Sequence, residues 1–174
     1  MRPLKSPRKI SEFQEKTIEV RRVTRVMAGG KRFSFRATVI VGNLKGKVGI
    51  GVAKGLDVAS AVRKAKRLAE KNIFYISLKD GRTIPYDIIS KYGASIVKIK
   101  PARKGHGLIA GGSCRTVLEL VGIKDISAKI LGRTTNKLTN ARATIEGLKK
   151  FITKNTEPEP EPKESVEETE EENL

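Results

Sequence analysis

A tight hairpin is the feature that most constrains the fold of this chain. Two strand-like runs, residues 17–27 and 33–41, flank Gly29 and Gly30. Glycine adopts positive φ angles at little steric cost, and a two-residue hairpin connection needs such angles. Four basic residues with no acidic residue between them surround the turn: Arg25, Lys31, Arg32 and Arg36. The sequence therefore predicts an antiparallel hairpin that presents positive charge to an anionic partner.

The apolar pattern extends the hairpin into a sheet. In the run from residue 33 to residue 41, apolar side chains alternate with polar ones, as in a half-buried strand, and Ile40 alone falls on the outer face. The apolar phase shifts between Val20 and Val23, which predicts a β-bulge there. After a turn at residues 42–46, alternation continues through residues 48–52. We therefore expect three antiparallel strands.

An amphipathic helix is predicted after the third strand. Apolar residues recur at helical spacing over residues 58–73, basic residues occupy the other faces, and Asp57 is a suitable N-cap. The first domain is accordingly a β-β-β-α unit over residues 14–77. A turn at residues 79–82 is the expected junction to the rest of the chain.

Residues 78–152 predict a smaller α/β domain. A Gly-rich stretch at residues 105–112 interrupts its apolar segments. The predicted elements are, in order, a hairpin of strands 84–90 and 96–100, a helix after the Gly-rich stretch ended by Gly122, a short strand over 126–131 and a last helix over 138–152. The whole chain is thus of the α+β class.

The two ends of the chain differ in charge. Residues 1–13 form a basic arm, whereas residues 153–174 form an acidic tail that its composition predicts to be disordered. From Glu157 onward there are nine Glu and one Lys, so the other 156 residues hold 35 basic and 10 acidic side chains, a net of +25. Bound polyanions offset such self-repulsion. Nucleic acid is the first expected partner, and an anionic membrane surface is the second.

Composition argues against several other classes. No apolar run approaches the roughly 20 residues that span a bilayer, and no apolar segment follows the basic N-terminus as in a secretory signal. With one Cys and one His, neither an internal disulfide nor a Cys/His metal site is expected. We therefore expect a cytoplasmic protein with no membrane partner, cofactor or small-molecule substrate.

The Gly-rich stretch precedes a helix, as phosphate-binding loops do. However, no Gly-Lys-[Ser/Thr] follows at P-loop spacing and no parallel βαβ unit precedes it, so we expect contact with RNA or a protein rather than a nucleotide cofactor. His106 has two interpretations, a surface residue or a general base, and the first is favoured. Cys114 is favoured as a helix-packing residue, although a helix start can lower a thiol pKa.

Phe33 also has two interpretations. Its phase with Phe35 favours a core residue, and its place beside the turn allows a platform for base stacking. Aromatic residues are only 5% of the chain, which favours recognition of phosphates, sugars and shape over stacking.

Four strings occur in an order and at separations that resemble the bacterial ribosomal protein S5 family. They are residues 29–35 (GGKRFSF), 47–51 (KVGIG), 107–112 (GLIAGG) and 142–148 (RATIEGL). The resemblance covers roughly residues 12–152. It implies an N-terminal domain similar to the double-stranded-RNA-binding fold, a C-terminal α/β sandwich domain, and a structural constituent of the small ribosomal subunit that binds rRNA and is not an enzyme.

The resemblance also implies neighbours and roles. Residues 27–32 reach toward the moving head of the subunit, and residues 103–115 face ribosomal protein S4, where changes alter decoding accuracy. Ribosomal protein S8 is a second neighbour, and the first domain lies near the messenger RNA entry path. The loop at residues 134–140 lacks the Asn-Pro pair usual in the family and is one residue longer, so no contacts are carried over to it.

Candidate contacts follow from charge together with this resemblance. RNA contacts that neutralise phosphate or bond ribose are expected at Arg25, Gly29, Gly30, Lys31, Arg32, Lys45, Lys47, Lys54, Arg103, Lys104 and Arg133. The surface toward S4 is expected at Gly105, His106, Gly107, Gly111 and Arg115. No catalytic or metal-binding residues are predicted.

Two other functions fit parts of the sequence. One is a free-standing regulator that binds double-stranded RNA. The other is a nucleotide-dependent, kinase-type enzyme, which the lack of an acidic metal-binding cluster in the folded body disfavours. The predicted function is that of a ribosomal structural protein that supports subunit assembly, translational accuracy and the messenger entry region.

Overall fold

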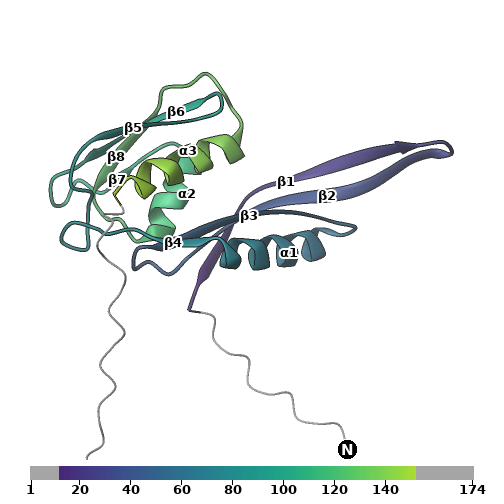
Figure 1. Cartoon of the computed structure of the whole chain (residues 1–174), viewed down its shortest axis with the longest axis horizontal. Coiled ribbons are helices and arrows are strands. Elements are labelled where there is room, and N and C mark those ends of the chain that lie inside the picture. The colour runs from purple at the N-terminus through teal and green to yellow at the C-terminus, as the bar shows by residue number, and fades with distance from the viewer. Residues whose placement is uncertain (1–11, 152–174) are drawn as a thin grey trace, which may run out of the picture.

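The computed structural model describes residues 12–151 as two sheet-and-helix units (Figure 1). The predicted arm, apart from its last two residues, and the predicted acidic tail lie outside the described residues. The first unit is rich in β-strands and the second combines strands with helices, in agreement with the predicted α+β class.

The first unit is a four-stranded antiparallel sheet with one helix. Its strands are β1 (Gln14–Met27), β2 (Gly30–Gly42), β3 (Lys47–Gly55) and β4 (Ile73–Tyr75), in the order β1-β2-β3-β4. The helix α1 (Val58–Lys71) begins at the predicted N-cap, Asp57. Small side chains on α1, among them Ala61 and Ala65, pack against Val39 and Val41 on one face of the sheet. Glycines in β3 let the helix approach closely, since a Cβ at Gly51 would collide with the Ala65 carbonyl.

The prediction of three strands was wrong. Helix α1 ends at Lys71, and the chain turns at once into β4, where Ile73 pairs with Gly49 of β3. The apolar spacing of the helix continues to Ile73 only because Ile73 happens to fall in phase. Ile73 is apolar because it belongs to a short edge strand. A three-residue strand carries too little alternation to be recognised in sequence.

The predicted position of the β-bulge was also wrong. The register shift lies between Thr17 and Glu19, and pairing is regular from there to the turn. Val20 lies opposite Ala37, on the face that α1 covers, whereas Val23 lies opposite Ser34 on the other face. The two valines therefore belong to different faces of one regular strand, and no extra residue separates them.

The second unit has two layers. Its sheet has the order β5-β6-β8-β7, with β5 (Ile88–Tyr92) and β6 (Ser95–Pro101) as a hairpin, β8 (Ile126–Ile130), and β7 (Leu108–Ile109) parallel to β8. Helices α2 (Gly112–Val121) and α3 (Lys137–Lys149) pack on one face of this sheet. Gly122, with φ of 93°, ends α2 as predicted.

Three details of the second unit differ from the sequence prediction. The first hairpin strand begins at Ile88 rather than at Ile84, which is buried outside the strand. The Gly-rich stretch contains β7, which pairs with β8 through only two residues. The last helix ends at Lys149, and Phe151 instead packs in the core. The first and third differences arise because apolar residues that suggest a strand or helix bury their side chains from loops.

The two units share one core. Ile40 lies on the sheet face away from α1, as predicted, yet it is fully buried because the second unit covers that face. Backbone hydrogen bonds cross the boundary, from Leu44 N to Leu120 O at 3.1 Å and from Gly46 N to Val121 O at 2.8 Å. The β2–β3 turn thus satisfies carbonyl groups that the end of α2 would otherwise leave unpaired.

Two glycines permit this close approach. A Cβ atom at Gly42 would collide with the backbone carbonyl of Leu120, and one at Gly122 would collide with the carbonyl of Leu44. No helix among residues 12–151 is long and apolar enough to cross a membrane.

Candidate nucleic-acid interface

The register of the first sheet gathers basic side chains on one face. Arg25 lies opposite Arg32, and Arg36 lies between Arg21 of β1 and Lys54 of β3. Because paired residues point to the same side of a sheet, these five side chains share the face away from α1. We call them the cationic hairpin face.

Positive charge on this face is almost uncompensated. Within residues 12–151, only Arg21 of the five forms an ion pair, with Glu19 at 2.7 Å. Arg25 and Arg32 are exposed and lie close to the turn of the hairpin. The turn end of this hairpin extends past α1 (Figure 1). Like charges placed directly opposite each other are destabilising, so this arrangement is relieved when an anion binds. The sequence had singled out Arg25, Arg32, Arg36 and Lys54, and the register adds Arg21.

The opposite side of the hairpin holds Phe33. Its ring is 48% exposed, and the Arg22 guanidinium lies over it at 4.8 Å from the centroid. The favoured prediction of a core residue was wrong, because the hairpin runs beyond the end of α1 and no element within residues 12–151 covers Phe33 there. Phe35, two residues nearer the body, does pack against the cluster beneath α1.

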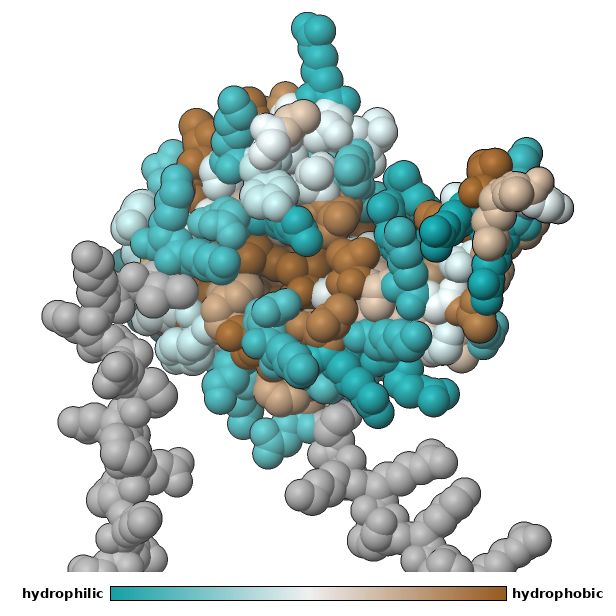
Figure 2. All heavy atoms as spheres, turned by 45° about the vertical axis from the view of Figure 1, so that its right-hand side comes forward, coloured by the Kyte–Doolittle hydropathy of each residue, from teal (hydrophilic) through white to brown (hydrophobic). Residues whose placement is uncertain are grey.

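The hairpin tip combines charge with exposed apolar surface. Gly30, with φ of 139°, makes the turn, and a Cβ at either Gly29 or Gly30 would meet no atom within 4 Å. Val26 is 75% exposed and Met27 is 50% exposed. Figure 2 shows apolar and hydrophilic residues side by side on this projecting end, at the right of the view. Apolar side chains at an extended tip indicate a contact surface rather than a solvated loop.

Lys45 and Lys47 lie elsewhere. Their backbone N–H groups both donate to the Asn43 side chain, at 2.8 and 2.9 Å, within the β2–β3 turn. This turn is at the end of β2 opposite to the hairpin tip. The structure therefore separates these two predicted RNA contacts from Arg25, Lys31 and Arg32.

The Gly-rich loop is held in shape by Asp125. One oxygen of this carboxylate accepts hydrogen bonds from the backbone N–H groups of Gly105 and Gly107, each at 3.0 Å, and the other lies 3.4 Å from Arg82. The hydrogen bond from Gly107 is the main cause that holds the pKa of Asp125 below its usual range, and Arg82 lowers the pKa further. Asp125 also fixes the linker, since its carbonyl accepts from the Thr83 hydroxyl at 2.7 Å.

Sequence reasoning missed Asp125. The available signal was an acidic residue directly before a short strand in a strongly basic body. Its role depends on contacts 18 and 20 residues away in sequence, which no local pattern reveals. The loop next to it carries Arg103 and Lys104 on exposed positions, and the His106 N–H donates to Arg103 O at 3.1 Å.

The residues predicted to face S4 fall into two groups. Gly105, His106 and Gly107 lie at the start of β8, where Ile126 N donates to Gly107 O. Gly111 lies against Ile130, at the other end of that strand. The two-residue strand β7 separates the groups, so they do not form one continuous patch.

Arg115 contributes to the contact between the units. Its Nε donates to Glu119 at 2.9 Å, and Lys16 of β1 donates to the same carboxylate at 2.7 Å. The hydrogen bonds from Lys16 and Arg115 lower the pKa of Glu119. Arg133, the last predicted RNA contact, is exposed just beyond β8.

The single histidine and the single cysteine lie apart. His106 is exposed on its loop, whereas Cys114 is buried at the start of α2, beyond β7. Burial raises the pKa of the Cys114 thiol, which confirms the packing interpretation and opposes reactivity. Within residues 12–151, no three His, Cys, Asp or Glu side chains are grouped as metal ligands.

Comparison with known proteins identifies the family. The family described as ribosomal protein S5, N-terminal domain, matches residues 13–77, and the ribosomal protein S5, C-terminal domain, matches residues 90–157. The chain belongs to the ribosomal protein S5 family.

Individual relatives agree over most of the chain. The protein named small ribosomal subunit protein uS5 of Thermosynechococcus vestitus is 46% identical over 147 residues, which cover 83% of this chain and 84% of the relative. The corresponding protein of Thermotoga neapolitana is 50% identical over 141 residues, which cover 81% of this chain and 78% of the relative. The protein named small ribosomal subunit protein uS5c of Guillardia theta is 50% identical over 144 residues, which cover 83% of this chain and 85% of the relative.

Membership of the S5 family decides the class of protein. The chain is a structural protein of the small ribosomal subunit and not an enzyme, and RNA binding in translation follows from the family. In bacteria this places it in the cytoplasm, within the ribosome.

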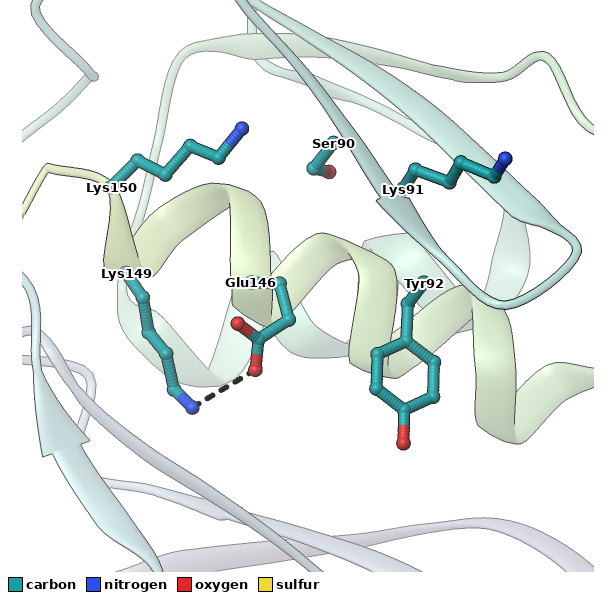
Figure 3. A pocket seen from close by; sticks show the side chains of 6 residues that line it. All are labelled: Ser90, Lys91, Tyr92, Glu146, Lys149 and Lys150. Carbon is teal, nitrogen blue, oxygen red and sulfur yellow. Dashed lines mark hydrogen bonds and ion pairs between the residues drawn. The ribbon is translucent and has the colours of Figure 1, made fainter.

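A hollow between the second sheet and α3 also gathers basic side chains. It has a volume of about 530 Å³ and lies between β5 and α3 (Figure 3). Its lining residues are Ser90, Lys91, Tyr92, Glu146, Lys149 and Lys150. Three lysines and one ion pair, between Lys149 and Glu146 at 3.0 Å, make a surface suited to anions.

Proposed function

We propose that this S5-family chain binds rRNA through the cationic hairpin face and thereby holds helical segments of the small subunit together during assembly. The observation that carries the proposal is the register of β1, β2 and β3, which brings Arg21, Arg25, Arg32, Arg36 and Lys54 onto one face. Only one of these five side chains has an acidic partner among residues 12–151.

The chemistry of such a face is recognition of the RNA backbone. Guanidinium groups bind phosphate oxygens in a bidentate manner, and each neutralised phosphate releases counterions, so affinity falls as salt rises. At the exposed tip, Val26 and Met27 add apolar surface whose removal from water favours binding. A helix on one face of an antiparallel sheet supports the proposed likeness of the first domain, residues 14–77, to the double-stranded-RNA-binding fold.

We propose a separate role for the Gly-rich loop of the second domain, residues 78–152. Asp125 fixes the loop at Gly105 and Gly107 before any partner arrives, so little ordering entropy is lost on binding. A prearranged loop with exposed Arg103, Lys104 and His106 suits a protein neighbour such as S4, and a contact there would let the chain affect translational accuracy. Contact with S8 and with messenger RNA at the entry path rests on the family resemblance alone.

The test of RNA binding reverses charge at the hairpin. Arg25→Glu combined with Arg32→Glu should lower affinity for small-subunit rRNA fragments by at least about tenfold and reduce the salt slope by about two, since two phosphate contacts are lost. Filter binding or fluorescence anisotropy over a salt series measures both quantities.

The matched control carries the same charge change on α1. Arg63→Glu combined with Arg67→Glu alters exposed residues on the other side of the first unit. Equal loss of affinity in the two double variants would show that net charge rather than the hairpin face drives binding, and the proposal would then fail.

A further inference from the structure

The second sheet leaves one face without a helix. Both α2 and α3 pack on the face that carries Val97, Ile99 and Ile126. On the opposite face, Lys98 lies between Ile89 and Lys129 in the register of the three strands. Alternation places four lysines there, which we call the lysine face: Lys91, Lys98, Lys100 and Lys129.

The lysine face has no internal counter-charge. The strands β5, β6 and β8 contain no acidic residue, and none of the four lysines forms an ion pair within residues 12–151. Ile89 and Ile109, on the same face, are each 54% exposed. The face continues into a hollow of about 310 Å³ lined by Lys100, Arg103 and His106 among others. An acidic segment with some apolar character would complement this surface.

The described chain ends at the β5 edge of this sheet, on the side that the helices cover. The ring of Phe151 contacts the ring of Tyr86 at 4.9 Å between centroids, and Lys150 Nζ donates to the Ile89 carbonyl at 3.5 Å. Ile89 lies on β5, the edge strand of the sheet. Figure 3 shows Lys150, at the end of α3, extending toward Ser90 of β5. The residues after Phe151 therefore start at the edge of the lysine face.

The following sequence supplies the opposite charge. Between Glu157 and Glu172 the chain has nine glutamates and a single lysine, Lys163. The span from Phe151 to Glu157 is up to roughly 20 Å when extended, at about 3.4 Å per residue. Three strands spaced about 4.8 Å apart are only about 10 Å across. The linker is thus long enough to pass round the edge strand β5 and to bring the acidic segment onto the lysine face.

We propose that the chain's own acidic segment, residues 157–172, docks on the lysine face of the second domain. Tethering by a short linker gives a local concentration on the order of millimolar, so several weak pairs suffice for occupancy. Such contacts are screened by salt and are exchanged for a stronger polyanion when one is present. The segment thereby covers a cationic surface until nucleic acid or an acidic partner displaces it.

Three other cationic surfaces could compete for the segment, namely the exposed side of α1, the cationic hairpin face and the hollow between β5 and α3. One of the three lysines in that hollow, Lys149, is already paired with Glu146. The hairpin tip lies at the far end of the molecule from α3 (Figure 1). The side of α1 carries Arg63, Lys64, Arg67 and Lys71, and is a fair match in charge. Proximity of the chain exit to β5 favours the lysine face.

Paramagnetic relaxation on the full chain locates the segment. A nitroxide attached to Ser165→Cys, with the native Cys114 buried and unreactive, should reduce amide signals of β5, β6 and β8 by more than about half at about 50 mM salt. The signals should recover at about 0.5 M salt, where the Debye length is only a few ångströms. Replacing the nine glutamates by Gln should abolish the reduction.

Matched lysine variants decide between the surfaces. Lys98→Gln with Lys129→Gln should weaken the effect on β5, β6 and β8, whereas Lys64→Gln with Arg67→Gln should leave it unchanged. Broadening centred on α1 or on the hairpin, or broadening that ignores salt, would overturn the proposal. Because RNA is absent from the experiment, its outcome is independent of whether the hairpin face binds rRNA.

Discussion

Two glycine turns of the first sheet look alike in sequence and differ in function. At the hairpin tip, a Cβ atom at Gly29 or Gly30 would meet nothing within 4 Å. At the β2–β3 turn, a Cβ at Gly42 would strike the Leu120 carbonyl of the other unit. The first turn reverses the chain in solvent, and the second permits contact between two backbones. Glycine content alone therefore says little about a turn until its neighbours are known.

The contact between the units and the hairpin also differ in how their charges are paired. Acidic residues near the contact between the units are engaged internally, since Glu119 holds Lys16 and Arg115, and Asp125 holds Arg82 and the Gly-rich loop. On the hairpin, by contrast, Arg25 and Arg32 have no acidic partner among residues 12–151. The few acidic groups of the body stabilise its fold, and most cations remain available to an external anion.

The largest expected effect comes from filling the tight glycine site. Gly42→Ala should destabilise the protein by about 3 kcal/mol, because a buried methyl group is forced against backbone that cannot easily move. Urea unfolding measures the change in free energy. The paired variant Gly29→Ala should change stability by less than about 0.5 kcal/mol, as the site is open. Equal losses in both would break the distinction between the two turns.

A smaller effect is expected from releasing the Gly-rich loop. Asp125→Ala leaves the N–H groups of Gly105 and Gly107 without their acceptor, so their hydrogen exchange should accelerate by roughly tenfold. Amide exchange measured by NMR reads this directly. Asp125→Asn keeps an acceptor oxygen and should change exchange less, and Asp87→Ala, at an exposed position, should leave the loop unaffected. Unaltered exchange in Asp125→Ala would mean that the loop is held by other contacts.

The smallest effect concerns the ion pairs of Glu119. Hydrogen bonds from Lys16 and Arg115 lower the pKa of this carboxyl in the folded state, so it contributes stability above its unfolded pKa and loses that contribution as pH falls through its folded pKa. Glu119→Gln should therefore cost about 0.5 kcal/mol at neutral pH, since the pairs are partly exposed.

The check is unfolding free energy against pH for the wild type and the variant. The two curves should converge on the acidic side of the usual carboxyl range. A gap that stays constant with pH would assign the loss to packing rather than to charge.

Prediction from sequence succeeded where a local pattern of residues arises from one structural cause only. The strand over residues 33–41, the N-cap at Asp57 and the helix stop at Gly122 were all confirmed. It failed where an apolar residue had another reason to be apolar, as at Ile73, which begins β4, and at Ile84, which is buried outside any strand. The prediction for Phe33 failed for the opposite reason. Its place in the alternating pattern suggested a core position, but no element within residues 12–151 covers it.

The sequence by itself determined the order of the elements apart from the short strands β4 and β7, the uncompensated positive charge and, through four short strings, the family. These properties depend on residues within a few positions of each other or on composition. Only the tertiary structure decided which face of the first sheet is buried, which cations stand in one row across β1, β2 and β3, and how Asp125 holds a loop from 18 residues away. Such contacts depend on register and on the packing of distant segments, and neither is written in any local pattern.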